Sequence, residues 1–308
     1  MGQSTNKTRV ILVLGVGLVA VSFASIFIKL CEAPSLVIAA YRLVIASVFY
    51  LGFTRIKSGP IWSSFSWSQR KIAFISGLFL TIHFTTWITS LKFTSVASSA
   101  VLVQTAPIFV ASGGFIVLGE RPSLTIIIGM TITLAGSIII SLHDFSLESG
   151  SIIGNLLAIG GAIGAAGYIL AGRKLRASMD TLHYVTAVYS FAAILLFIFA
   201  IGSGASLIGY SLRNYLLLVA IAVVPQIIGH TSFNWALKYL SATTISIILL
   251  GEPIGASILA VLLLDEGLSL VKIVGGVIII SGVTLVLIAE ARGNTLKLNS
   301  LSGDTKKD

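Results

Sequence analysis

Residues 91–136 read LKFTSVASSAVLVQTAPIFVASGGFIVLGERPSLTIIIGMTITLAG, and residues 237–282 read LKYLSATTISIILLGEPIGASILAVLLLDEGLSLVKIVGGVIIISG. A shift of 146 residues aligns the two stretches without a gap and pairs Pro107 with Pro253. Apolar helices share Leu and Ile by chance, whereas shared Pro, Gly, Glu and Lys at one offset indicate an internal duplication. The other matched pairs are Leu91 with Leu237, Lys92 with Lys238, Ser95 with Ser241, Glu120 with Glu266, Gly129 with Gly275 and Gly136 with Gly282.

The composition of the whole chain excludes an ordinary soluble domain. Hydrophobic residues make up 56% of the 308 residues, charged residues make up 10%, and the mean hydropathy is +1.02. Soluble domains carry about 25% charged residues, and the 20 Lys and Arg with 11 Asp and Glu here are too few to cover a globule of this length. A lipid bilayer accepts such an apolar outer surface. The sequence therefore predicts an all-α integral membrane protein.

Ten apolar segments are long enough to cross the hydrocarbon core of a bilayer. Most breaks between them carry Gly, Pro or charged residues, which end helices. The basic, Trp-containing connection over residues 54–71 is expected to be a helix at the membrane interface, and the polar tail after Arg292 is expected to be disordered. The ten predicted transmembrane helices are 10–30, 35–53, 72–91, 95–118, 123–142, 151–172, 182–202, 214–237, 241–264 and 270–290.

The duplication divides these ten helices into two repeats of five. The predicted organisation is a cytoplasmic N-terminus over residues 1–9, a first repeat over 10–142, a second repeat over 151–290 and a polar cytoplasmic tail over 291–308. Because five is odd, the second repeat must enter the membrane in the opposite orientation. Inverted-topology repeats around a central cavity are a recurring architecture of secondary transporters, with the substrate site near the midplane.

The basic residues predict the orientation of the chain in the membrane. With the N-terminus in the cytoplasm, 15 Lys and Arg fall on the cytoplasmic side, 4 fall on the opposite side, and Arg42 lies within a helix. Cytoplasmic loops carry an excess of Lys and Arg. We therefore expect a multi-pass protein of the plasma (inner) membrane with both termini in the cytoplasm.

Several segments resemble the EamA-type branch of the drug/metabolite transporter superfamily. The run 97–121 with its closing Gly-Glu-Arg-Pro, its second copy 236–266 and the Tyr-Arg-Leu at 41–43 are similar to motifs of that family. One departure is Asp265, where the first copy has Gly119. The resemblance implies a ten-helix fold with a central cavity. It also implies export or exchange of small metabolites, often amino acids or related compounds.

Arg42 and Glu252 are ionisable residues at predicted membrane depth, where a charge usually faces a cavity or a partner. The planar fork of Arg42 suits a substrate carboxylate, although the side chain could also snorkel outward or bind backbone carbonyls. Glu252 directly precedes Pro253, which removes a backbone hydrogen bond and bends the helix. Glu252 could carry a coupling proton or contact the substrate; alternatively it pairs with Arg42 or caps the broken helix.

Two further groups of polar residues share helix faces. His83 and Trp87 are four residues apart and so lie on one face, where they can form a wall for an amphipathic ligand, although a neighbour could simply satisfy the histidine. Gln226, His230 and Asn234 form a polar stripe with the same spacing. Such a stripe is expected to line a cavity or to form interhelical hydrogen bonds.

Gln104 lies shortly before Pro107, close to the position that corresponds to Glu252 in the other repeat, and is also expected to line the cavity. Glu120 and Glu266, which close corresponding helices, are expected to cap neighbouring helices or to hold gates. The complete set of candidate substrate-binding and cavity residues is Arg42, His83, Trp87, Gln104, Gln226, His230, Asn234 and Glu252.

These observations predict a secondary transporter that moves a small organic metabolite by alternating access. A membrane enzyme and a channel are the alternatives, but the sequence has neither GxxxxGK[ST] nor HExxH, and its His, Cys and acidic residues lack metal-ligand spacing. We expect no catalytic residues, metal or cofactor. The net charge of +9 is spread over short gaps between apolar runs, which argues against nucleic-acid binding. The expected partners are a small-molecule metabolite, a coupling proton and the lipid bilayer, with the chain a monomer or a homodimer.

Overall fold

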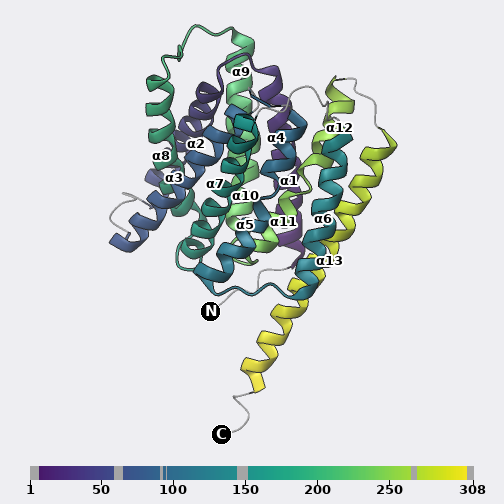
Figure 1. The fold of residues 1–308 in the computed structure, drawn as a ribbon. Helices are drawn as coiled ribbons and strands as arrows, with labels where there is room; N and C mark the ends of the chain where they lie inside the picture. Colours follow the sequence, from purple (N-terminus) through teal and green to yellow (C-terminus); the bar gives the residue numbers. More distant parts are fainter. Residues whose placement is uncertain are drawn as a thin grey trace.

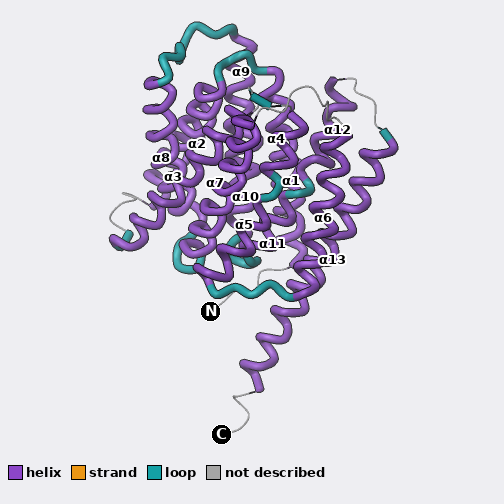
Figure 2. Tube along the Cα trace, viewed as in Figure 1, coloured by secondary structure: helices purple, strands orange, loops and turns teal. Residues whose placement is uncertain are grey.

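The computed structural model describes residues 7–58, 65–90, 93–94, 96–143, 152–264 and 269–303. No strand occurs in these ranges. Figure 1 shows a bundle of helices that run up and down along a common direction, and Figure 2 shows that short loops join them at the two ends. This arrangement satisfies the backbone hydrogen bonds within each helix, as a lipid environment requires.

The described residues of each half form a series of helices, some of which are separated only by a short break. The helices of the first half are α1 (Lys7–Leu30), α2 (Ser35–Ser58), α3 (Trp67–Ser90), α4 (Val96–Val103), α5 (Ala106–Gly113), the π-helix η2 (Gly114–Leu118) and α6 (Leu124–His143). The helices of the second half are α7 (Ile152–Arg176), α8 (Thr181–Gly202), α9 (Leu212–Ile221), the π-helix η3 (Ala222–His230), α10 (Thr231–Ala236), α11 (Ala242–Leu249), α12 (Glu252–Leu264) and α13 (Leu270–Gly303).

Eight helical segments among the described residues are long and apolar enough to cross a membrane. They correspond to eight of the ten predicted spans. The predicted spans 95–118 and 123–142 contain shorter apolar helices, Ala106–Leu118 and Leu124–Ile139. The eight segments are Thr8–Leu30, Ser35–Ser58, Trp67–Ser90, Ile152–Arg176, Thr181–Gly202, Leu212–Ala236, Ala242–Leu263 and Ile273–Arg292.

The interruptions of the two corresponding helices repeat at the offset seen in the sequence. α4 begins at Val96 and α11 at Ala242, which are 146 residues apart, and the second pieces begin at Ala106 and Glu252, again 146 residues apart. In both copies a proline occupies the second position after the break. A proline there has no N–H to donate to the preceding turn, so the helix is interrupted.

Two parts of the chain differ from the sequence-based expectation. Residues 54–58 extend α2 and residues 67–71 begin α3, so these parts of the predicted interfacial helix belong to the bundle instead; residues 59–64 lie outside the described range. The tail is also helical as far as Gly303, because the backbone of α13 continues without a proline beyond the apolar segment. Figure 1 shows this extension projecting from the bundle.

Side-chain caps begin several helices of the second half. Asp180, Ser211 and Ser241 have extended backbones, and each side chain accepts a hydrogen bond from the backbone N–H three residues later. These caps satisfy N–H groups that have no partner within the helix. The starts of α8, α9 and α11 are thereby fixed.

α6 and α13 cross closely through small residues. A Cβ atom on Gly136 would lie 2.7 Å from the carbonyl oxygen of Gly275, and one on Gly282 would lie 2.8 Å from that of Gly129. The early glycine of one helix therefore meets the late glycine of the other, so the two helices run antiparallel, as Figure 1 also shows. Small residues allow this approach of two backbones in a membrane.

Glycines also bring α3 against α7 and α1 against η3. A Cβ on Gly164 would lie 2.6 Å from the backbone nitrogen of His83, and one on Gly229 would lie 2.7 Å from the side chain of Val21. His83 and Val21 both belong to the wall of one internal pocket. The close helix pairs therefore fix the frame in which the pocket lies.

Candidate binding cavity

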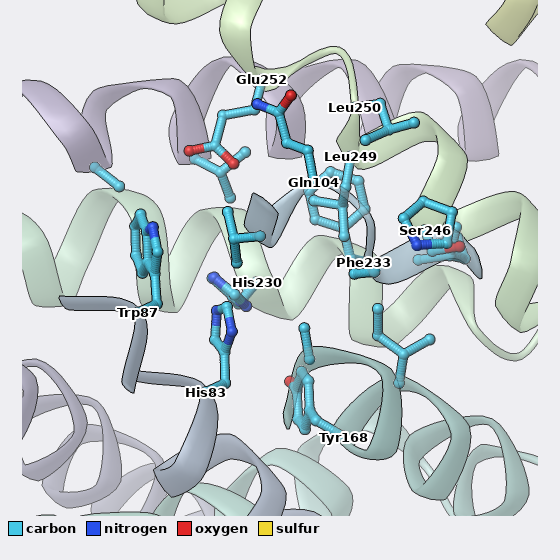
Figure 3. A pocket seen from close by; sticks show the side chains of 18 of the residues that line it. His83, Trp87, Gln104, Tyr168, His230, Phe233, Ser246, Leu249, Leu250 and Glu252 are labelled. Atoms are coloured by element: carbon cyan, nitrogen blue, oxygen red, sulfur yellow. The ribbon is translucent and has the colours of Figure 1, made fainter. Parts of the chain in front are cut away.

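A cavity of about 120 Å³ lies among residues of both halves of the chain. The first half contributes side chains of α1, α2, α3 and the α4–α5 break, and the second contributes side chains of α7, η3, α10, α11 and α12. Figure 3 shows several of these side chains converging from opposite sides. Of the eight candidates from the sequence, the seven that line the cavity are Arg42, His83, Trp87, Gln104, His230, Asn234 and Glu252.

Arg42 is the most deeply buried charged residue of this wall, with 1% of its surface exposed. Its Nε donates a 2.7 Å hydrogen bond to Oε1 of Gln226, and its Cζ lies 4.2 Å from the ring centroid of Phe84. A guanidinium is stabilised when it lies over the face of an aromatic ring. Its two terminal nitrogens have no hydrogen-bond partner among the described residues.

Gln226 is the one candidate that does not line the cavity. It is fully buried behind Arg42 and holds that side chain by its amide oxygen, whereas its Nε2 has no partner in the described part of the chain. It belongs to η3, which contains Pro225. Arg42 and Gln226 together hold three buried nitrogen donors that have no acceptor among the described residues. Each buried donor without an acceptor costs about 1–3 kcal/mol.

His83 and Trp87 share one face of α3, as their spacing predicted, and their side chains are stacked. Their rings are 5.7 Å apart and nearly parallel, at 9°. Nδ1 of His83 lies 2.9 Å from the carbonyl oxygen of Gly161. Because a carbonyl can only accept, this contact assigns the proton to Nδ1. The two interpretations of His83 are therefore compatible.

Asn234 lines the cavity and also joins helices. Its Oδ1 accepts a 2.7 Å hydrogen bond from Tyr168, and its Nδ2 donates a 3.0 Å hydrogen bond to the hydroxyl of Tyr189. His230 lies nearby, with its ring 6.5 Å from that of Tyr168. Asn234 therefore fixes the packing of α7, α8 and α10 around the cavity.

Glu252 and Gln104 lie at the two helix breaks, and Figure 3 shows them on the side of the pocket opposite His83. The amide oxygen of Gln104 accepts a hydrogen bond from Ser137. The backbone carbonyl of Glu252 accepts a 3.3 Å hydrogen bond from Ser22. No hydrogen bond or ion pair to the Glu252 carboxylate occurs among the described residues.

Tyr168 and Phe84 are not among the residues singled out from the sequence, although both contact the candidate residues. Tyr168 is four residues after Gly164, on the face of α7 that meets α3, and its hydroxyl reaches Asn234. Phe84 neighbours His83 and carries the guanidinium of Arg42 on its ring. An isolated aromatic residue in an apolar helix carries no distinguishing signal in a single sequence.

Glu120 joins the two halves at one end of the bundle. Gly119 has a positive φ of 66°, which ends η2 in a left-handed turn before Glu120. One carboxylate oxygen of Glu120 lies 2.9 Å from Nε of Arg173, and the other accepts a 3.3 Å hydrogen bond from the backbone N–H of Ala242. The corresponding Glu266 lies outside the described residues.

Among the described residues, no group of three or more His, Cys, Asp or Glu side chains is placed to hold a metal ion. The cavity instead combines aromatic surfaces with a guanidinium, an amide and a carboxylate. Such a mixture suits an organic molecule with both apolar and polar parts.

Comparisons with known proteins agree with this picture. The chain is 27% identical over 288 residues to an uncharacterized transporter of Archaeoglobus fulgidus, covering 91% of this chain and 97% of the relative. It is 24% identical over 218 residues to the uncharacterized transporter YdfC of Bacillus subtilis, covering 70% of each. A crystal structure of another protein superimposes with a TM-score of 0.78 at 16% identity, covering 92% of this chain and 99% of that one, which shows a shared fold.

The family comparison reports the duplication directly. The model of the EamA-like transporter family matches residues 8–142 and, a second time, residues 152–288. The two matches together cover nearly the whole chain, and each contains one of the interrupted helices described above. The chain belongs to the EamA-like transporter family.

Proposed function

We propose that this protein is a secondary transporter that carries small organic metabolites across the plasma (inner) membrane by alternating access. The observation that carries the proposal is the cavity itself, because residues of both repeats line it. A rearrangement of one repeat against the other would open such a cavity to one side and close it to the other. Export or exchange of amino acids or related compounds is the activity that the family resemblance favours.

Ten membrane crossings with inverted repeats are part of this proposal. Two observations support them. α6 and α13, which correspond to one another in the duplication, run antiparallel. In addition, Figure 1 shows the first turn of α1 and the last turns of α13 at the same end of the bundle, as an even number of crossings requires. The excess of basic residues on this side supports the proposal that this end faces the cytoplasm.

The cavity chemistry supports an amphipathic ligand. His83 and Trp87 present a stacked aromatic wall, and Arg42 and Glu252 bring opposite charges to the same space. A molecule with an apolar body and charged groups of both signs complements these features. Because Glu252 has no fixed partner among the described residues, it is also the group that we propose to carry a coupling proton.

A ligand-stabilisation screen tests this proposal even before the substrate is identified. Detergent-purified protein is heated in the presence of amino acids, amines, nucleosides or carboxylic acids. We expect one class to raise the unfolding midpoint by about 2 °C at saturation. Trp87→Ala should abolish the effect, whereas Trp67→Ala, which alters an exposed tryptophan outside the cavity, should retain it.

Mass spectrometry of the stabilising compound after incubation provides the second readout. An unchanged compound supports a transporter, and a chemically altered one supports the enzyme alternative. If no class stabilises the protein, or if Trp67→Ala removes stabilisation as Trp87→Ala does, the cavity is not the ligand site.

A further inference from the structure

Three nitrogen atoms at the contact between α2 and η3 share an unusual property. Nη1 and Nη2 of Arg42 and Nε2 of Gln226 are buried, and none has a hydrogen-bond acceptor among the described residues. All three belong to side chains that are joined by the 2.7 Å bond from Arg42 to Gln226. Buried polar groups are nearly always hydrogen-bonded, so a group of donors at one place points to an acceptor.

The known neighbours of Arg42 leave these donors unused. Phe84 stacks on the flat face of the guanidinium, 4.2 Å from its centre, and stacking engages no N–H group in the guanidinium plane. Gln226 accepts only from Nε. Glu252 attracts Arg42 electrostatically, but no ion pair joins the two side chains within the described residues. Arg42 lines the cavity, and its two terminal nitrogens are buried without an acceptor among the described residues.

We infer that Arg42 and Gln226 form an anion-binding subsite in the wall of the cavity. Its ligand is an anionic group that accepts hydrogen bonds and donates none. Such a group either offers two acceptor atoms to the guanidinium edge or is a spherical ion that lies between the three donors. A carboxylate and a chloride ion share this chemistry. The carboxylate would belong to the transported molecule, and the chloride would be a separate bound ion.

Gln226 acts in this subsite as a positioning residue and as a donor. Its amide oxygen accepts a hydrogen bond from Nε and so fixes the rotation of the guanidinium, which leaves Nη1 and Nη2 of Arg42 without a partner among the described residues. Gln226 is fully buried in η3 and does not line the cavity. Its Nε2 can therefore donate only to an anionic group that lies beside Arg42, and not to a ligand at the centre of the cavity. The inference deepens the proposed function, because it names a chemical group of the ligand at the proposed transport site.

Thermal unfolding in matched salts tests the subsite directly. Detergent-purified protein is studied at constant ionic strength while sodium chloride or sodium acetate replaces the sodium salt of the bulky anion 2-(N-morpholino)ethanesulfonate. We expect a saturable rise of the unfolding midpoint by about 2 °C. Saturation with chloride alone identifies a free inorganic anion as the occupant. Saturation with acetate, in competition with chloride, identifies a carboxylate.

Two variants and a control connect the effect to these residues. Gln226→Glu places a fixed carboxylate beside the guanidinium, so the anion effect should vanish while the protein remains folded. Arg42→Gln should also abolish it. Arg55→Gln removes the same charge from an exposed position on the same helix and should retain the full effect.

The subsite is overturned if the natural protein shows no saturable rise of the unfolding midpoint with either anion. It is also overturned if Gln226→Glu shows the same rise as the natural protein. The proposed function is judged separately by transport in vesicles. Transport without an Arg42-dependent anion effect overturns the subsite alone. An anion effect without transport of any compound of the ligand screen contradicts the proposed function and leaves the subsite standing.

Discussion

A basic side chain, Arg42, and an acidic one, Glu252, line the same cavity. No ion pair joins them in the described part of the chain. A permanent pair would neutralise both groups and leave little for a ligand to gain. The separation instead leaves the guanidinium edge and the carboxylate available at the same time. At the scale of single residues, this arrangement supports the proposal that the ligand brings its own charges.

Glu252→Gln tests whether this carboxyl couples transport to protons. The variant keeps the size and hydrogen-bonding capacity of the side chain but cannot ionise. We expect transport driven by a pH gradient to fall to background, while exchange between equal pools of substrate continues. The measurement is uptake into proteoliposomes with and without an imposed pH gradient.

Glu290→Gln is the matched control, since Glu290 is a hydrogen-bonded carboxylate outside the cavity, bound to Ser241 and Thr244. It should leave the pH dependence unchanged. If Glu252→Gln transports at the natural rate with the natural pH dependence, Glu252 has only a structural role.

Helical spacing placed His83 with Trp87 and His230 with Asn234, and all four line the cavity, whereas Gln226 of the same predicted stripe does not. Spacing of four residues brings side chains onto one face of an α-helix. η3 is a π-helix, whose wider turn changes the direction in which successive side chains point. His230 and Asn234 accordingly reach the cavity, whereas Gln226 lies behind Arg42. A π-helix has no reliable signature in a single sequence.

At the scale of elements, proline and glycine explain what the sequence could reveal. Pro253 predicted a bend in its helix, and Pro107 is the matched residue of the first copy; both helices are interrupted at these prolines. The matched glycines, which indicated the duplication, lie where α6 and α13 cross closely. The extent of α2 and α13 was not predictable in the same way, since polar residues can continue a helix beyond the membrane.

Gly136→Ala tests the crossing of α6 and α13. The new Cβ would lie 2.7 Å from the carbonyl oxygen of Gly275 and 2.9 Å from the nitrogen of Ile279, so two backbones must separate. We expect a loss of about 1–3 kcal/mol in stability, read as a lower midpoint of thermal unfolding. Gly15→Ala meets no atom within 4 Å in α1 and should leave the midpoint unchanged or slightly raised. Equal midpoints for the two variants would contradict the close crossing.

At the scale of the whole molecule, the orientation in the membrane can be read from cysteine labelling. With Cys31 replaced by serine, a cysteine at Ser206 should react with a membrane-impermeant maleimide added to intact cells. A cysteine at Ser178 should react only after permeabilisation. Both positions are exposed in connections at opposite ends of the bundle. Labelling with the reverse pattern would invert the proposed orientation.

The natural cysteine is a useful internal standard for this experiment. Cys31 lies between α1 and α2 and is 8% exposed. Burial raises the pKa of its thiol, so the reactive thiolate is scarcer at neutral pH than in an exposed cysteine. The natural protein should therefore label slowly at pH 7 and faster as the pH rises. Rapid labelling at pH 7 would show that this end of the bundle is more open than the structure describes.

We propose that one cavity opens to the two sides of the membrane in turn, and a counterflow experiment measures this alternation. Proteoliposomes are loaded with the unlabelled compound that stabilises the protein best and are diluted into a trace of the same compound carrying a radioactive label. A carrier that exchanges ligand through one alternating cavity predicts transient accumulation of label above its final equilibrium level. A channel instead produces gradual equilibration without an overshoot, and this result would contradict transport through one alternating cavity.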